Sequence, residues 1–361
     1  MVDSERTHPD IGEVQAVADM QPVPTEPSPR LDAAGPGPES VRLVLEPGAH
    51  ALGRHAEAPG DIPWLGWKAV LRRTLIEMLT DRVSLVAAGC AFYGTLALFP
   101  AMSMFISIYG MLFDPVTVEP QLEVLRGLVP PSAFTLIAER VHMLVSRPPG
   151  SLGLRLLFST GITLWSSATG VKSIISALNI AYEEKERRSV LHFQLMSFTI
   201  TLLGMLSAVI GLALLVGLPA ILTELGFASH QKVLIRLASF ALLVLAILTG
   251  LSLLYRYGPC RERPRWRWVT PGSIAATVLW VAASALFSIY VGQFATYDAT
   301  YGPLGTVVGI MMWFWVTVYA VLLGAELNAE LELQTVVDST EGPPLPLGRR
   351  GAYVADHVAE D

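Results

Sequence analysis

Three uncharged stretches constrain the fold of this chain more than any other feature of its sequence. Val83–Phe113, Phe193–Thr223 and Trp268–Tyr297 each run for 30 or 31 residues without a charged residue or a histidine. A helix needs about 20 predominantly apolar residues to cross the hydrocarbon core of a bilayer. Only 16% of the residues are charged and 52% are hydrophobic, a composition that argues against an ordinary soluble enzyme. The sequence predicts an all-α, polytopic membrane protein.

The pattern of apolar residues predicts six transmembrane helices within a membrane domain at residues 63–333. The spans are expected at residues 83–113, 152–181, 193–222, 234–255, 269–296 and 304–331. Helix kinks are expected at Pro100 and Pro219, because an internal proline removes a backbone donor and clashes with the preceding turn. The GxxxG sequence of Gly305 and Gly309 predicts close helix packing there.

Both ends of the chain are acidic and rich in proline, a composition that predicts disorder. Residues 1–62 and residues 334–361 are expected to be disordered cytoplasmic tails, so that residues 63–335 alone should insert and fold. Amphipathic helices are expected on both membrane surfaces. The inner one carries a stripe of Trp64, Trp67, Leu71, Leu75 and Met78, and the outer one a stripe of Phe134, Ile137, Val141, Leu144 and Val145.

The orientation follows from lysines and arginines near the span ends, which favour the cytoplasmic side. One side collects twelve of them: Lys68, Arg72, Arg73, Arg82, Lys185, Arg187, Arg188, Arg256, Arg261, Arg263, Arg265 and Arg267. The other side collects six: Arg126, Arg140, Arg147, Arg155, Lys232 and Arg236. Both termini and the loops at 183–192 and 256–267 are therefore expected in the cytoplasm, and the loop at 114–150 outside.

An ordered set of motifs resembles the YihY/BrkB family over about residues 68–333. The C-terminal half carries LLYRYGP (Leu253–Pro259), PGSIAATVLW (Pro271–Trp280), SIYVGQF (Ser288–Phe294), TYGPLGTVVGIMMWFW (Thr300–Trp315) and LLGAELNAE (Leu322–Glu330). The N-terminal half carries AFYGTLALFP (Ala91–Pro100), LWSSATG (Leu164–Gly170) and ALNIAYEEKERR (Ala177–Arg188). The resemblance implies a six-helix bacterial inner-membrane protein. Members have been named ribonuclease BN or serum-resistance factor and linked to export of envelope lipid or lipopolysaccharide. The resemblance implies no catalytic residues.

The residues themselves indicate no catalytic, cofactor-binding or metal site. A metal-dependent nuclease gathers carboxylates and histidines around its ions, but four of the seven histidines lie in the expected tails. No two histidines have HxH or HxxxH spacing, and no nucleotide-binding glycine pattern occurs. A basic loop contains Arg256, Arg261, Arg263, Arg265 and Arg267. It could contact phosphate, although a positive-inside anchor near anionic headgroups is the favoured interpretation. Neither an enzyme nor a nucleic-acid partner is expected.

Polar residues at helical spacing define a candidate pathway through the membrane domain. On the second span, one helix face carries Trp165, Thr169, Lys172, Ser176 and Asn179. On the sixth span, Trp315, Tyr319, Glu326 and Glu330 lie close to one face. Lys172 and Glu326 are expected at similar depth near the cytoplasmic side, where they could form a structural pair, snorkel to the surface or line a wet cavity.

These features favour transport or translocation of an envelope lipid or other amphiphile. The alternative is a non-catalytic membrane scaffold that recruits envelope-biogenesis enzymes through its tails. Membrane lipids are the expected partners, and an envelope lipid is the expected substrate. The sequence leaves the substrate, the energy source and the oligomeric state open.

Overall fold

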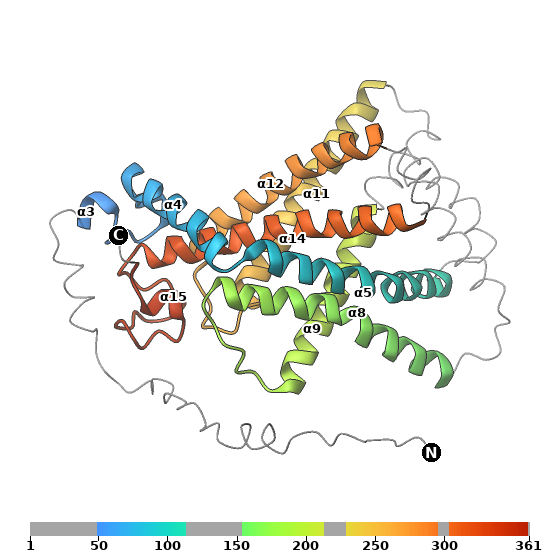
Figure 1. The fold of residues 1–361 in the computed structure, drawn as a ribbon, viewed down its shortest axis with the longest axis horizontal. Helices are drawn as coiled ribbons and strands as arrows, with labels where there is room; N and C mark the ends of the chain where they lie inside the picture. The colour runs from blue at the N-terminus through green and yellow to red at the C-terminus, as the bar shows by residue number, and fades with distance from the viewer. Residues whose placement is uncertain (1–48, 113–153, 213–228, 295–302, 360–361) are drawn as a thin grey trace, which may run out of the picture. The chain divides into compact units, whose positions relative to one another are not determined.

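The apolar stretches form long α-helices, as the sequence predicts. The computed structural model describes residues 49–112, 154–212, 229–294 and 303–359, which are helical or irregular and contain no β-strand. The elements are α3 (Ala49–Leu52), η1 (Pro59–Asp61), α4 (Trp64–Thr80), α5 (Val83–Leu112), α8 (Leu154–Ala181), α9 (Val190–Leu212), α11 (Ser229–Tyr257), α12 (Trp266–Phe294), α14 (Pro303–Leu333) and α15 (Tyr353–Asp356) (Figure 1). The all-α prediction is therefore confirmed.

Four helices are long and apolar enough to cross a membrane within the described residues. Their qualifying segments are Val190–Ser207, Val233–Tyr257, Trp266–Tyr290 and Val307–Leu333. The first two predicted spans coincide with α5 and α8. The apolar segments described in these two helices, Val83–Leu98 and Ala168–Ala181, are shorter and are not among the four. Helix α5 continues through Pro100, and the kink expected there stays a prediction. Pro219 and the outer amphipathic stripe lie outside the described residues.

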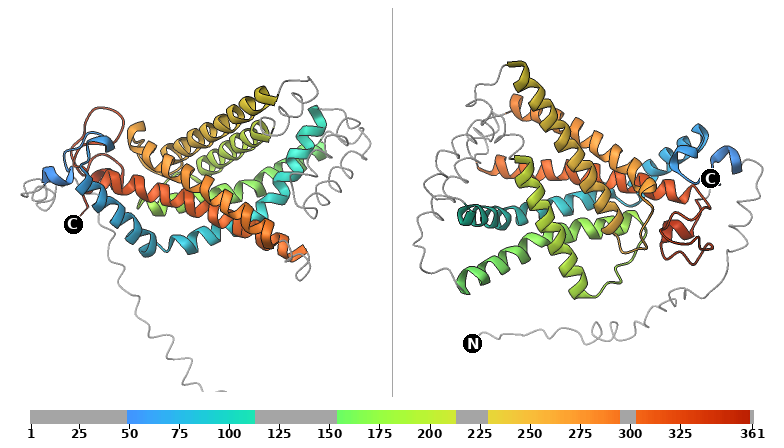
Figure 2. Two further views of the ribbon diagram at one scale, coloured as in Figure 1. Left: turned by 90° about the horizontal axis from the view of Figure 1, so that it is seen from above. Right: turned by 180° about the vertical axis from the view of Figure 1, so that it is seen from behind.

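Helix α14 contacts α5, α8 and α12, and also α4 and α15, so it lies at the centre of the described helices. Helix α9 packs on α8, and α11 packs on α12 (Figure 2). Helix α4 and the C-terminal residues contact the last turns of α14. All of these elements belong to one unit, Pro36–Asp361.

A pair of glycines allows α12 and α14 to approach each other closely. A Cβ atom added at Gly272 would collide with the carbonyl oxygen of Gly324, and one at Gly324 would lie 2.5 Å from both the Gly272 carbonyl oxygen and Tyr255 Oη. By contrast, a Cβ atom at Gly309 would meet nothing within 4 Å. The close contact between helices is thus made near the C-terminal end of α14, and the expectation of close packing at Gly309 is wrong for the described residues.

Both expected tails contain folded residues, which corrects the predicted boundaries. From the N-terminal tail, residues 49–62 form α3 and η1, and Arg54, Ala56 and Ile62 are buried. From the C-terminal tail, residues 334–359 form an ordered segment, called the C-terminal segment below. Composition predicted disorder because few of these residues are apolar, but hydrogen bonds and a few buried side chains replace a large hydrophobic core here. Residues 1–48 lie outside the described residues.

Candidate functional site

The end of α14 and the residue that follows it carry five polar side chains that are all buried. They alternate along the chain: Glu326, Asn328, Glu330, Glu332 and Gln334. At 100° per residue, the first, third and fifth share one helix face, and the second and fourth share the opposite face. The end of this helix is therefore polar on two sides, although α14 is apolar over most of its length.

Arg73 of α4 neutralises one carboxylate on the face that carries Glu326, Glu330 and Gln334. Arg73 Nε lies 2.6 Å from Glu330 Oε2, and Arg73 Nη2 donates a hydrogen bond of 2.5 Å to Gln334 Oε1. Val70 packs one turn earlier against Leu327 and Leu331. Arg73 and Val70 therefore attach α4 to the end of α14.

Glu326 is the third member of this face and has a different environment. Its side chain is 3% exposed, and its Oε1 atom accepts no hydrogen bond from any described residue. The charges that act on it belong to carboxylates, first Asp81 and then Glu330, Glu77 and Glu183. A buried carboxyl oxygen without a donor is costly. Glu326 therefore lacks the compensation that Glu330 obtains from Arg73.

The opposite face of α14 holds α12 and the basic loop. Asn328 accepts a hydrogen bond from the backbone of Gly272 at 2.8 Å and donates one to the Val269 carbonyl at 3.1 Å. Glu332 forms an ion pair of 2.7 Å with Arg261, and both side chains are fully buried. The Arg261 guanidinium also lies 4.1 Å from the ring centroid of Tyr182. Both polar side chains on this face of α14 are thus paired, although Nε and Nη1 of Arg261 have no hydrogen-bond partner among the described residues.

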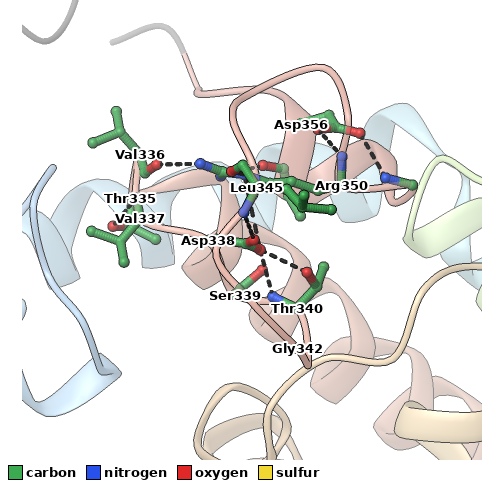
Figure 3. Close-up of polar contacts among 12 residues, drawn as sticks. Thr335, Val336, Val337, Asp338, Ser339, Thr340, Gly342, Leu345, Arg350 and Asp356 are labelled. Atoms are coloured by element: carbon green, nitrogen blue, oxygen red, sulfur yellow. Dashed lines mark hydrogen bonds and ion pairs between the residues drawn. The ribbon is translucent and has the colours of Figure 1, made fainter.

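The C-terminal segment is organised by two carboxylates and one arginine (Figure 3). Asp338 accepts hydrogen bonds from the backbone of Thr340 and Leu345 at 2.9 and 2.8 Å. Arg350 donates to three backbone carbonyls, those of Val336, Leu345 and Ala355. Asp356 accepts from the backbone of Gly348, Arg350 and Gly351. These bonds give the segment a defined conformation without a large apolar core.

The C-terminal segment also joins three regions that are distant in sequence. Val336 N donates to the carbonyl of Arg54, Tyr353 N donates to Glu184 Oε1, and Glu262 N donates to the carbonyl of Gly351, over 2.8, 2.7 and 3.1 Å. A single β-bridge pairs Pro264 with Thr340. The α8–α9 and α11–α12 connections and the start of the described chain thus meet at one end of the helices.

The predicted polar face of α8 divides into an exposed part and a buried part. Trp165 is 57% exposed, Ser176 is also exposed, and Thr169 is half-buried. Asn179 is buried, because it accepts a hydrogen bond from Cys260 N at 2.8 Å and donates one to Glu186 at 3.1 Å. The residues of this face therefore differ in burial, since the α11–α12 connection contacts Asn179 near the end of α8.

Lys172 and Glu326 form no ion pair in the described structure. Lys172 Nζ instead lies 4.8 Å above the ring of Trp165, on its own helix. Tyr319 lies beside Trp315, with ring centroids 5.7 Å apart and the ring planes tilted, and packs against the apolar core. Of the two predicted polar faces, the structure brings together only the members near the end of α14.

The five arginines of the basic loop differ in role. Arg256 and Arg261 are buried in ion pairs with Glu341 and Glu332. Arg263 lies over the ring of Tyr257 at 5.2 Å. Arg265 donates a hydrogen bond of 3.4 Å to the carbonyl of Gly342, and Arg267 is exposed. At least two of the five are therefore internal structural residues, and the positive-inside anchor near anionic headgroups stays a prediction for the loop.

Electrostatics at this end of the helices perturb several groups outside the spans. Burial, and then the charges of Glu183 and Glu77, raises the pKa of Asp81 to about 6. Burial alone would raise the pKa of Glu186, but hydrogen bonds from Arg188 and Asn179 lower it to about 2. Within the described residues, no three His, Cys, Asp or Glu side chains are placed to share a metal ion.

The sequence interpretation missed most of the partners at this site. Arg73 pairs with Glu330, which lies 257 positions later in the chain. Asp338 and Arg350 lie in the part of the chain whose composition predicts a disordered tail. One usable signal was the i, i+4, i+8 spacing of Glu326, Glu330 and Gln334, which places all three on one face.

The comparisons with known sequences agree with this architecture. The sequence profile of the family described as virulence factor BrkB matches residues 74–346. The chain belongs to the BrkB family. The match ends at residue 346 and therefore includes the first part of the C-terminal segment.

Individual relatives carry only broad descriptions. The ribonuclease-like protein YfkH of Bacillus subtilis is 30% identical over 253 residues, which are 68% of this chain and 88% of YfkH. A UPF0761 membrane protein of Laribacter hongkongensis is 28% identical over 70% of this chain and 58% of its own length. Another UPF0761 membrane protein, of Albidiferax ferrireducens, is 24% identical over 75% of this chain and 64% of its own length. This chain thus spans less than two thirds of these two membrane relatives. No solved structure matches it significantly.

Proposed function

We propose that this BrkB protein translocates an envelope lipid or other amphiphile and that Glu326 takes part in the translocation. The observation that supports the proposal is the burial of the Glu326 carboxyl group, in a helix long enough to span a membrane, without a hydrogen bond to Oε1 from a described residue. Ionisable residues at such positions are costly and usually serve a function. Glu330 and Glu332 are less suitable, because each has an arginine partner.

The chemistry of Glu326 suggests what it would recognise. Because its electrostatic neighbours are carboxylates, the complementary species is positive. A cationic headgroup or a proton would satisfy the Oε1 atom and relieve the repulsion among the carboxylates. In this proposal the protein has no enzymatic activity, and the amphiphile carries or accompanies that positive charge.

The proposal includes the membrane arrangement predicted from the sequence. All six long helices would cross the bacterial inner membrane, with both termini in the cytoplasm. The supporting observations are the twelve-to-six asymmetry of basic residues and the hydrogen bonds that join the α8–α9 connection, the α11–α12 connection and the C-terminal segment at one end.

A second candidate is a scaffold for envelope-biogenesis partners. The observation that favours it is the ordered C-terminal segment, which presents exposed side chains such as Leu345 and Tyr353, each 42% exposed, on a fixed backbone. A scaffold of this kind would use that surface and would not need an unpaired carboxyl group within a span.

The two candidates separate in liposomes that contain only the purified full-length chain. Transfer of fluorescent lipids between leaflets is measured for the wild type, for Glu326→Gln and for Glu57→Gln, a matched change at an exposed carboxylate. Translocation by the wild type and Glu57→Gln, with a loss in correctly folded Glu326→Gln, supports the proposal. Unchanged transfer in Glu326→Gln contradicts the role of this residue, and no transfer of zwitterionic, anionic or cationic lipids by the wild type favours the scaffold.

A further inference from the structure

Helix α4 exposes an apolar surface along its whole length. The exposed large side chains are Trp64, Leu65, Leu71, Leu75, Ile76 and Leu79. At 100° per residue they fall within a sector of about 140° on one side of the helix. Trp64, Leu75 and Leu79 are 69%, 62% and 81% exposed. The stripe expected from the sequence is therefore displaced, since Met78 is buried and Trp67 packs partly inside.

The opposite side of α4 is fixed to the protein. Val70 and Met78 are buried against the two apolar clusters of the core, and Arg73 is paired with Glu330. The helix cannot rotate to bury its exposed sector without breaking this ion pair. The exposed sector is thus a surface for something outside the chain, because contiguous apolar surface of this kind marks an interaction site.

Two positive charges lie within the same sector. Lys68 and Arg72 are exposed between the apolar residues, and Lys68 Nζ lies 5.6 Å from the ring centroid of Trp64. The acidic residue of α4, Glu77, points more than a quarter turn away from the sector. Cations inside an apolar face are unfavourable in a dry protein interface, but in a bilayer interface their long side chains reach the phosphate groups.

The exposed sector also continues towards a long apolar helix. Only Asp81 and Arg82 separate α4 from α5, whose first turns expose Leu85 and Phe92. The two helices meet at an angle (Figure 2, left), and Arg82 adopts a positive φ of 51° at the joint. An α5 helix that enters the membrane would therefore hold α4 near the level of the headgroups.

We propose that this sector of α4 binds the membrane surface, with its apolar side chains inserted at the acyl boundary and with Lys68 and Arg72 bound to anionic lipid headgroups. This binding is independent of translocation, since it uses none of the groups around Glu326. Each basic residue near an anionic surface attracts the helix further. The site would therefore prefer phosphatidylglycerol to zwitterionic lipid.

An environment-sensitive nitrobenzoxadiazole label on α4 tests the proposal in the full-length chain. The label is attached to Leu75→Cys, and separately to Leu79→Cys, after Cys90 and Cys260 are replaced by alanine. Each protein is reconstituted in phosphatidylcholine vesicles with or without phosphatidylglycerol, and quenching by doxyl-labelled lipids is measured. We expect lipid quenching at both positions, stronger with phosphatidylglycerol, and no quenching of a label at Leu345→Cys on the C-terminal segment.

Charge reversal distinguishes the anionic-lipid site from a general apolar surface. Lys68→Glu/Arg72→Glu should remove the increase caused by phosphatidylglycerol, whereas Lys185→Glu/Arg349→Glu, with the same charge change at exposed positions, should keep it. Labels at 75 and 79 that remain accessible to aqueous iodide in both vesicles would overturn the proposal. Labels shielded from iodide and from doxyl lipids alike would also overturn it, and would assign the face to a second protein copy. Because lipid transfer between leaflets is measured separately, failure here leaves the role of Glu326 intact.

Discussion

Arg261 and Glu332 combine full burial of both side chains with an ion pair of 2.7 Å. Removal of one partner leaves an uncompensated buried charge, which costs about 3–5 kcal/mol. We therefore expect Arg261→Met and Glu332→Leu each to lower the free energy of unfolding by about that amount, and the double variant to recover most of the loss. Thermal and denaturant unfolding in detergent measure the effect. Losses that simply add in the double variant would show that the pair is not coupled.

Asp81 gives a pH-dependent prediction, because burial and the nearby carboxylates of Glu183 and Glu77 raise its pKa from 3.8 to about 6. The folded chain then holds this proton more tightly than the unfolded chain, so the ionised side chain destabilises the fold. Its contribution to stability falls as the pH rises from about 4 to about 6. Asp81→Asn should unfold at a higher temperature than the wild type above pH 6, and this difference should disappear near pH 4. An equal difference at both pH values would contradict this assignment.

At the scale of helices, the contact of Gly272 with Gly324 is the most restrictive feature of the packing. A Cβ atom at Gly324 would lie within 2.5 Å of two oxygen atoms, whereas Gly309, in the same helix, faces open space. Overpacking of a core costs about 1–3 kcal/mol and sometimes more. Gly324→Ala should therefore lower the unfolding temperature, and Gly309→Ala should not. Equal stability of the two variants would mean that α12 and α14 do not approach each other in this way.

The C-terminal segment should depend on Asp338. Burial opposes its ionisation, but hydrogen bonds from Leu345 and Thr340 and the charge of Arg350 lower its pKa overall. A lowered pKa stabilises the folded state above the ordinary value, and this contribution disappears as the pH falls. Asp338→Ala should therefore expose the segment to limited proteolysis at neutral pH, and acidification should have the same effect on the wild type. Arg349→Ala, at an exposed position, is the control and should remain resistant.

Truncation tests the same element more severely. Ending the chain at residue 335 would remove the Gly351 carbonyl that accepts from Glu262 N and the Tyr353 N that donates to Glu184 Oε1. We expect residues 63–335 to be less stable than the full chain, in contrast to the expectation from composition. Because this form also lacks residues 49–62, equal unfolding temperatures in detergent would show that neither the C-terminal segment nor residues 49–62 stabilise the fold.

The long helices could be predicted from the sequence because their signal is local. Each apolar stretch specifies a helix by its own length and composition, and the six predicted ranges overlap α5, α8, α9, α11, α12 and α14. The site depends on contacts between distant residues, such as Arg73 with Glu330 and Asn179 with Cys260. Spacing along one helix placed Glu326 and Glu330 on one face, but it carried no information on which of them an arginine from α4 would neutralise.

At the scale of the whole molecule, polar contacts gather at the end of the helices where α4, the basic loop and the C-terminal segment meet. Composition identified the apolar part of the chain correctly, because burial in lipid requires it. Composition wrongly predicted disorder for residues 334–359. A short segment with few apolar residues can be ordered by hydrogen bonds to carboxylates and from arginines, as around Asp338 and Arg350.

The proposed translocation and the proposed lipid site on α4 share one assumption, that all six long helices cross the membrane and that the polar end faces the cytoplasm. The most direct measurement is labelling of single cysteines by a membrane-impermeant maleimide in intact and permeabilised cells, with Cys90 and Cys260 replaced. Cysteines at Glu262 and Tyr353 should react only after permeabilisation, whereas a cysteine within residues 114–150 should react in intact cells. Reaction of Glu262 and Tyr353 from opposite sides, or protection of residues 114–150 in intact cells, would contradict the six-span arrangement.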